Sequence, residues 1–213
     1  IHTMMNEARV QRLVMGSEFA LALKDDGTLR AWGDNGSKQL GIGVSDDERA
    51  EPVQIDGLEH IVSVAAGGYH GAAVREDGTV WAWGDNQYGQ LGDLTTTARS
   101  APVQVRGLLG VTQVSAGLRH TMALKSDGTV WTWGYNYYGE LGDGTNTNRN
   151  APSQVVGLAH IVAISAAGSG CLALQSDGTV WAWGDNTFGQ LGDGTTAHQS
   201  TPKKVPGLSG APL

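Results

Sequence analysis

Short runs of apolar and small residues alternate with turn-forming residues along the chain, and the pattern returns about every fifty residues. In the second unit these runs occupy four segments, residues 61–65, 71–75, 79–83 and 102–105. Each run has the length of a strand, and no stretch shows the sustained period of an amphipathic helix. The pattern predicts four short strands per unit, which we call A, B, C and D, and no helix.

The turn between strands B and C carries the same residues in every unit. Asp-Gly-Thr recurs at residues 26–28, 77–79, 127–129 and 177–179. Because Asp-Gly supplies the positive φ of a two-residue hairpin turn, we expect such a turn within residues 76–79. Four further markers keep the same register, namely Trp-Gly, Leu-Gly, a proline and Gly-Leu. The proline at the start of strand D predicts an outer, edge-like strand, where a missing N–H costs least.

Tandem units of four strands are typical of a β-propeller, in which each unit forms one blade. We therefore expect an all-β propeller with four four-stranded blades, at residues 9–57, 58–107, 108–157 and 158–208. Residues 1–8 are expected to be leader or vector-derived residues, because position 1 is not Met, and residues 209–213 a tail.

Seven tryptophans recur in strand C. In three units two Trp residues are separated by one residue, so both rings point to the same face of the blade. Because blades pack on one another through these faces, the rings should supply much of the apolar contact between blades. The predicted structural core is Trp32, Trp81, Trp83, Trp131, Trp133, Trp181 and Trp183.

The repeat resembles the RCC1-like (regulator of chromosome condensation) repeat. The resemblance rests on residues 114–124 (VSAGLRHTMAL), 127–136 (DGTVWTWGYN) and 138–145 (YGELGDGT). It implies a propeller that binds another protein. Members of this family include an exchange factor for a small GTPase on chromatin, a plant UV-B receptor, a bacterial β-lactamase inhibitor and modules of ubiquitin ligases.

Two of these family functions disagree with the residues. The UV-B receptor carries Gly-Trp-Arg-His-Thr segments, whereas residues 117–121 place Leu118 where the Trp is needed. The exchange factor uses a nearly complete seven-bladed face and a basic tail, whereas the one adjacent basic pair here is Lys203-Lys204. Photoreception and nucleotide exchange are therefore not expected.

The number of blades raises a question of closure. Propellers of the resembled family generally have seven blades, and four blades leave an apolar face at each end, which normally marks an interface. The chain could close as a four-bladed ring, two chains could form an eight-bladed ring, or the chain could be part of a longer propeller. We favour a homodimer of two four-bladed arcs. Repeats that curve as in a seven-bladed ring should not readily tighten into a four-bladed ring.

Charge and cysteine content exclude several classes of site. With 21 acidic and 14 basic residues the net charge is −7, which disfavours nucleic acid as a partner. No apolar run approaches the length of a membrane span, so no membrane is expected as a partner. The single cysteine, Cys171, permits no intrachain disulfide and no cysteine zinc cluster, and is expected to be a buried small apolar residue.

The polar motifs favour structural roles over catalysis. His70 and His120 occupy the same place in their units but have no matched carboxylates, so we expect structural histidines. The Asp-Gly-Thr segments at 143–145 and 193–195 lack the alternating acidic pattern of a calcium loop and predict Asx-type turns. No nucleophile elbow, phosphate loop or dinucleotide fingerprint is present. We expect no catalytic residue, no metal and no cofactor, and therefore no enzyme.

The two edges of such a blade differ in sequence. The A–B tips and C–D loops should emerge on one face, and the constant B–C turns and the D–A links on the other. Long, variable loops on a rigid scaffold are where binding residues concentrate. Aromatic and Arg side chains there suit a protein interface. The candidate partner-binding residues are Phe19, Tyr69, Arg119, Ser169, Tyr88, Tyr138 and Phe188.

The sequence therefore predicts a non-catalytic protein-interaction module that binds through the A–B tips and C–D loops. A first alternative is a structural unit that self-assembles into a ring as a homodimer. A second alternative, based on the aromatic and Asn-rich loops, is a propeller that binds a carbohydrate or another small molecule.

Overall fold

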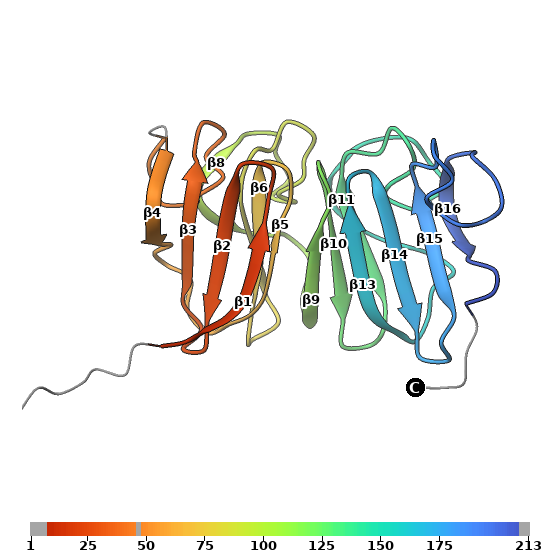
Figure 1. The fold of residues 1–213 in the computed structure, drawn as a ribbon, viewed down its shortest axis with the longest axis horizontal. Helices are drawn as coiled ribbons and strands as arrows, with labels where there is room; N and C mark the ends of the chain where they lie inside the picture. Colours follow the sequence, from red (N-terminus) through yellow and green to blue (C-terminus); the bar gives the residue numbers. More distant parts are fainter. Residues whose placement is uncertain (1–7, 46–47, 209–213) are drawn as a thin grey trace, which may run out of the picture.

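The structure is a computed structural model that describes residues 8–45 and 48–208. These residues form sixteen strands in four antiparallel sheets, and no helix occurs among them (Figure 1). Each sheet contains four consecutive strands in chain order, which confirms the predicted all-β fold with four four-stranded blades. Apart from Ala8, the expected leader and tail lie outside the described residues. Within the described ranges, no helix could cross a membrane.

The strands of the four blades recur in the order A to D. Blade 1 contains β1 (Val10–Met15), β2 (Phe19–Lys24), β3 (Leu29–Asp34) and β4 (Glu48–Gln54). Blade 2 contains β5 (Ile61–Ala66), β6 (His70–Arg75), β7 (Val80–Gly84) and β8 (Arg99–Gln104). Blade 3 contains β9 (Val111–Ala116), β10 (His120–Lys125), β11 (Val130–Gly134) and β12 (Arg149–Gln154). Blade 4 contains β13 (Ile161–Ala167), β14 (Gly170–Gln175), β15 (Val180–Gly184) and β16 (Gln199–Lys204).

The B–C turn has three residues, so the prediction of a two-residue hairpin is wrong. In blade 2 the Arg75 N–H donates to the Thr79 carbonyl at 2.9 Å, which leaves residues 76–78 as the loop. Gly78 alone takes a positive φ, of 78°, as in a type I turn followed by a left-handed residue. Asp77 contributes to the turn through its carboxylate, which accepts hydrogen bonds from the amide and the hydroxyl of Thr79.

Strand D lies at the edge of each sheet, as predicted, but begins earlier than its proline. In blade 2, β8 starts at Arg99, and Pro102 is its fourth residue. The pairing of β7 with β8 shifts register between Ala82 and Gly84, opposite this part of the strand. An edge strand with irregular pairing tolerates proline because it does not need every N–H for the sheet.

One Trp from each of blades 2, 3 and 4 fills the core against the preceding blade. Trp83, Trp133 and Trp183 are completely buried, and each joins a cluster of aliphatic side chains from two neighbouring blades. Each indole N–H also donates to a backbone carbonyl of the preceding blade at 2.9 Å. The second rings, Trp81, Trp131 and Trp181, are partly buried against the same clusters. Six of the seven tryptophans therefore pack between blades.

Trp32 is the exception to the predicted Trp core. Its neighbour Ala31 is completely buried against blade 2, so alternation along β3 points Trp32 to the opposite side of blade 1. No preceding blade lies there among the described residues, and Trp32 remains half-buried. The prediction failed because a strand pattern gives the face of a residue but not whether a neighbour covers that face.

The four blades form an open arc (Figure 1). Successive inner strands contact one another, β1 with β5, β5 with β9, and β9 with β13. Within residues 8–45 and 48–208, no contact of similar extent joins β13 back to β1. The arc therefore has two free ends, the outer face of blade 1 and the outer face of blade 4.

Candidate functional site

The two edges of the blades carry the elements expected of them. The Asp85 N–H donates to the carbonyl of Tyr69 at 2.8 Å, which ties the start of a C–D loop to an A–B tip. Equivalent bonds reach Glu18, Arg119 and Ser169 in the other blades. At the opposite edge, a B–C turn bonds to a D–A link through the Glu76 N–H and the His60 carbonyl. We call the edge with the tips and the C–D loops the loop face.

Buried asparagines hold the C–D loops in fixed conformations. Asn86 Nδ2 donates to the carbonyls of Thr95 and Thr97, while its Oδ1 accepts from the Leu91 amide at 3.0 Å. Asn136 and Asn186 repeat this pattern in blades 3 and 4. The Asx-type turns expected in these loops are also observed, since Thr145 and Thr195 donate to the Asp two residues earlier. Loops fixed in this way lose little conformational entropy when they bind.

A series of aromatic rings crosses the loop face from blade 2 to blade 4. Tyr88 meets Tyr135 edge-on with ring centroids 4.8 Å apart, and Tyr135 stacks on Tyr137 at 6.4 Å. Tyr137 contacts Tyr138 at 5.0 Å, and Tyr138 contacts the imidazole of His198 at 4.8 Å. Tyr137 is 66% exposed. The series is therefore a continuous and partly exposed aromatic surface.

Arg119 extends this surface at its blade 2 end. Its guanidinium carbon lies 5.2 Å from the ring centroid of Tyr88 and 6.0 Å from that of Tyr135. Arg119 is exposed, and a cation–π contact at such a site contributes about 0.5–1 kcal/mol. The two rings thus hold an exposed guanidinium in a defined place on the loop face.

Most of the residues predicted to bind a partner lie on the loop face. Arg119, Tyr88 and Tyr138 belong to the aromatic series. Tyr69 and Ser169 are half-buried tip residues, and Phe188 is 90% exposed on a blade 4 loop.

Phe19 is the correction, because it is only 2% exposed and lies in the core between blades 1 and 2. Phe19 pairs with Gly33 as His70 pairs with Gly84, so the tip residue of blade 1 is Glu18. Sequence reasoning aligned the first tip one residue too late, because the first unit lacks the histidine that marks this place in units two and three.

Sequence reasoning also missed Tyr135, Tyr137 and His198. Tyr135 follows Trp-Gly, where the other three units have Asp. This departure from the repeat was the available indication that the third unit differs at its loop.

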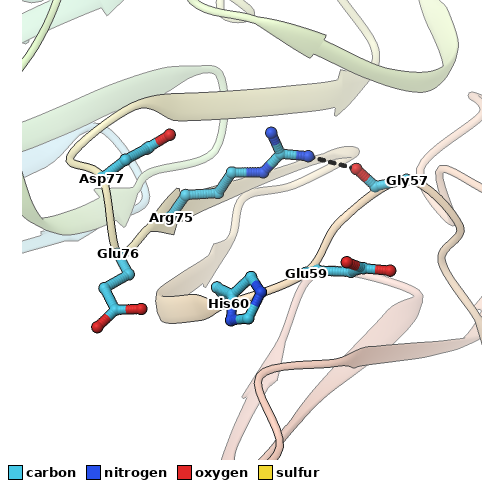
Figure 2. A pocket seen from close by; sticks show the side chains of 6 residues that line it. All are labelled: Gly57, Glu59, His60, Arg75, Glu76 and Asp77. Carbon is cyan, nitrogen blue, oxygen red and sulfur yellow. Dashed lines mark hydrogen bonds between the residues drawn. The ribbon is translucent and has the colours of Figure 1, made fainter.

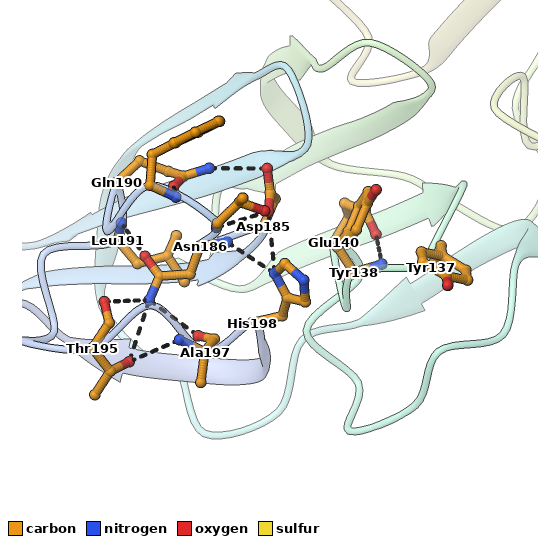
Figure 3. A network of polar contacts seen from close by, with 12 residues as sticks. Tyr137, Tyr138, Glu140, Asp185, Asn186, Gln190, Leu191, Thr195, Ala197 and His198 are labelled. Atoms are coloured by element: carbon orange, nitrogen blue, oxygen red, sulfur yellow. Dashed lines mark hydrogen bonds and ion pairs between the residues drawn. The ribbon is translucent and has the colours of Figure 1, made fainter.

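The same departure changes a polar pair beneath the loop. In the other three blades a Gln side chain donates to the Asp after Trp-Gly, as Gln90 does to Asp85 at 2.8 Å and Gln190 to Asp185 at 2.9 Å. Blade 3 has Tyr135 and Glu140 at these two places. Figure 3 shows Glu140 beside Tyr138, whose N–H donates to Oε2 at 2.9 Å. The Glu140 side chain is buried, and burial raises its pKa.

A cavity lies at the opposite edge, between the link to blade 2 and its B–C turn (Figure 2). It measures about 620 Å³ and is lined by Gly57, Glu59, His60, Arg75, Glu76 and Asp77. Arg75 donates to the Gly57 carbonyl and lies 4.2 Å from the ring centroid of Trp81. These two contacts hold the Arg75 side chain in place. The acidic side chains of the lining, Glu59, Glu76 and Asp77, are exposed. This cavity is separate from the candidate residues of the loop face.

The buried titratable groups hold neighbouring blades together. His70 Nε2 lies 2.9 Å from Thr121 Oγ1, and His120 Nε2 lies 3.0 Å from Cys171 Sγ. Cys171 is buried, and burial raises the pKa of its thiol well above the ordinary value. Among the described residues, no group of three or more His, Cys, Asp or Glu side chains is arranged to hold a metal ion.

Comparisons with known proteins agree on one family. The family model described as "RCC1-like domain" matches residues 2–212. The E3 ubiquitin-protein ligase HERC2 of Homo sapiens is 42% identical over 91 residues, which are 42% of this chain and 2% of that protein. The ultraviolet-B receptor UVR8 of Arabidopsis thaliana is 40% identical over 86 residues, 39% of this chain and 19% of that protein. The chain thus spans a small part of these curated relatives.

Solved structures give the same result. Human WBSCR16 matches 93% of this chain and 53% of its own, with a TM-score of 0.85 and 27% identity. Prp20p from Saccharomyces cerevisiae matches 95% of this chain and 52% of its own, with a TM-score of 0.80 and 22% identity. The chain spans about half of each solved structure. By its family-model match and its blade structure, the chain belongs to the RCC1-like domain family.

Proposed function

We propose that this chain is a non-catalytic protein-interaction module that binds its partner through the loop face. The observation that carries the proposal is the continuous surface formed by Arg119 and the rings from Tyr88 to His198. Tyr and Arg dominate the energetics of protein interfaces because they bring a large contact area at low conformational cost.

The preorganisation of the loop face supports this proposal. The buried asparagines fix the C–D loops before any partner arrives, and Tyr88 and Tyr135 fix the Arg119 guanidinium. An interface of this kind loses little conformational entropy on binding. The solved structure of Prp20p, which shares this fold, is described with its binding properties to Gsp1p and histones. Protein binding is therefore a function that this fold supports in a relative.

The test compares variants on the two edges. A Tyr69→Ala, Arg119→Ala double variant should lose a partner identified by cross-linking to the wild-type chain, with at least a tenfold weaker affinity, about 1.4 kcal/mol. Glu76→Ala at the opposite edge is the matched control and should bind as the wild type does. Retained binding by the double variant, in a sample with wild-type unfolding behaviour, would contradict the proposed face.

A second candidate role, assembly of a ring from two copies, is favoured by the ends of the arc. On blade 4, Leu172 is 42% exposed, whereas Met122 at the same place in blade 3 is completely buried. On blade 1, Leu13 is 65% exposed, whereas Val64 at the same place in blade 2 is 2% exposed. The two ends are thus the two halves of the interface that joins blades within the chain.

Head-to-tail pairing of two copies would cover both ends and produce an eight-bladed ring, within the four to eight blades that propellers use. Light scattering over a range of concentrations tests this role. A species of twice 22.3 kDa supports it, and a monomer at every concentration contradicts it.

A further inference from the structure

The junction of blades 3 and 4 differs from the junction of blades 2 and 3 at three equivalent places on the loop face. Between blades 2 and 3 lie Tyr88 and Gln90 from one blade, and Arg119 and Tyr135 from the next. The corresponding residues between blades 3 and 4 are Tyr138, Glu140, Ser169 and Asp185. We call these four residues the junction site. One ring is retained, a cation is replaced by a small hydroxyl, and two neutral side chains are replaced by carboxylates.

The two junctions correspond in backbone geometry as well as in their place in the repeat. The amide of Tyr135 donates to the carbonyl of Arg119 at 2.9 Å, and the amide of Asp185 donates to the carbonyl of Ser169 at 2.9 Å. Ser169 therefore starts from the same backbone place as Arg119. Its short side chain does not cover Tyr138 in the way that the Arg119 guanidinium covers Tyr88.

Glu140 places a buried carboxyl group at the junction site. The residue is completely buried, and its Oε1 has no hydrogen-bond partner among the described residues. Burial raises the pKa of Glu140, the hydrogen bond from the Tyr138 amide opposes the rise, and the charge of Asp185 adds to it. The carboxylate lies close enough to Ser169 and Asp185 to interact with both. A buried acceptor without a partner costs free energy that an approaching cation would recover in part.

Asp185 adds a second carboxylate to the junction site, where Thr187 and Gln190 donate hydrogen bonds to it and the His198 imidazole lies beside it. Burial alone would raise its pKa, but hydrogen bonds from Thr187 and Gln190 and the neighbouring His198 outweigh that effect and lower it, so Asp185 is ionised at neutral pH. His198 Nδ1 lies 3.1 Å from Asp185 Oδ1 and 3.1 Å from the Asn186 amide nitrogen. The imidazole also forms an aromatic wall beside Tyr138 (Figure 3).

We propose that the junction site binds an arginine guanidinium of the partner protein. The guanidinium would lie against Tyr138, as Arg119 lies over Tyr88, and hydrogen-bond to Asp185, with the unpartnered Oε1 of the buried Glu140 behind it. Ring stacking combined with a carboxylate is a combination that a guanidinium satisfies better than other side chains do. This inference rests on the proposed function, because it names the chemistry that the loop face recognises.

The test uses a defined probe. We would titrate the peptide acetyl-Gly-Arg-Gly-amide into the isotope-labelled chain and follow the amide resonances, with the citrulline peptide as the uncharged match. The Arg peptide should shift the resonances of Tyr138, Ser169 and Asp185 and bind about tenfold more tightly than the citrulline peptide, since charge-assisted hydrogen bonds are roughly twice as strong as neutral ones. Equal binding of both peptides, or Arg-specific shifts elsewhere on the chain, would overturn the proposal.

Two variants and one control sharpen the result. Ser169→Arg supplies an internal guanidinium, as Arg119 does one blade earlier, and should abolish peptide binding. Ser176→Arg adds the same charge at the opposite edge of blade 4 and should leave binding unchanged. Asp185→Asn should weaken binding about tenfold without adding bulk, which keeps the test decisive if Ser169→Arg does not fold. Undiminished binding by both junction variants would overturn the proposal.

Failure of this inference and failure of the proposed function are distinguishable. If the identified partner is lost on Arg119→Ala but is bound equally by Ser169→Arg and the wild type, the loop face is right and the junction site is wrong. If the partner binds all of these variants equally, the loop face itself is wrong.

Discussion

His120 and Cys171 meet between blades 3 and 4, with Nε2 of the histidine 3.0 Å from Sγ of the cysteine. The thiol also donates to the Glu140 carbonyl at 3.3 Å, so it accepts the proton of the histidine Nε2. One blade earlier, His70 Nε2 and Thr121 Oγ1 form the same relay to the Gln90 carbonyl. Each relay joins a tip, a strand of the next blade and the base of a C–D loop, and so fixes the loop face.

Replacing Cys171 tests this relay. Thr121 performs the same role one blade earlier, so Cys171→Thr should change the free energy of unfolding by less than about 1 kcal/mol. Cys171→Val has a similar volume but no donor, and it should cost about 1–3 kcal/mol, because the Glu140 carbonyl and the His120 N–H both lose a partner. Urea unfolding measures both values. Equal stability of the two variants would show that the relay contributes nothing.

Acid should destabilise the chain through its two buried histidines. Burial lowers the pKa of His70 to about 4, and burial together with His70 lowers the pKa of His120 to about 3. An unfolded histidine titrates near 6.5, so the unfolded chain binds more protons below that pH. The stabilisation is fully present above pH 6.5 and is lost as the pH falls toward 4, at about 1.4 kcal/mol per pH unit for each histidine.

His70→Phe is the matched variant for this pH dependence, because Phe19 occupies the same place in blade 1. The slope of unfolding free energy against pH between 6.5 and 4 should fall by about 1.4 kcal/mol per unit. The measurement is urea unfolding at several pH values in this interval. An unchanged slope would show that His70 does not titrate on unfolding.

The buried and the end tryptophans should differ in their contribution to stability. Trp183→Ala removes a completely buried ring from the core between blades 3 and 4 and should cost about 3–5 kcal/mol. Trp32→Ala removes a half-buried ring from the open side of blade 1 and should cost less than half as much. Denaturant unfolding compares the two. Equal costs would mean that another surface covers Trp32 in solution, as a second copy would.

The pair Tyr135 and Glu140 should behave as one exchanged unit. The double variant Tyr135→Asp, Glu140→Gln restores the Asp–Gln pair of the other three blades. Tyr135→Asp alone places a carboxylate near the buried Glu140 and should destabilise the chain. The double-mutant cycle should show about 0.5–3 kcal/mol of favourable coupling in unfolding experiments. Additive effects would contradict a paired role.

The regular features of this fold could be predicted from the sequence. The glycine at position 78 follows from local backbone conformation, and the Trp spacing follows from strand alternation. The fifty-residue period follows from the repeat itself, and sequence patterns encode all three features directly. The B–C turn was misjudged by one residue, because Asp-Gly suits both a two-residue turn and a type I turn followed by a left-handed Gly.

The candidate site was less predictable, because it depends on contacts between blades. The aromatic series joins Tyr88, Tyr135 and His198 from three different blades, and no strand pattern specifies how far apart blades place their loops. Phe19 was misplaced by a single residue, and on a strand such a slip exchanges a buried side for an exposed one.

The most direct test of the account is the location of the partner. A photo-cross-linking amino acid would replace Tyr137, the most exposed ring of the aromatic series, or Glu76 at the opposite edge. A specific adduct should form from position 137 and none from position 76. An adduct from position 76 with none from position 137 would contradict the claim that the loop face binds the partner.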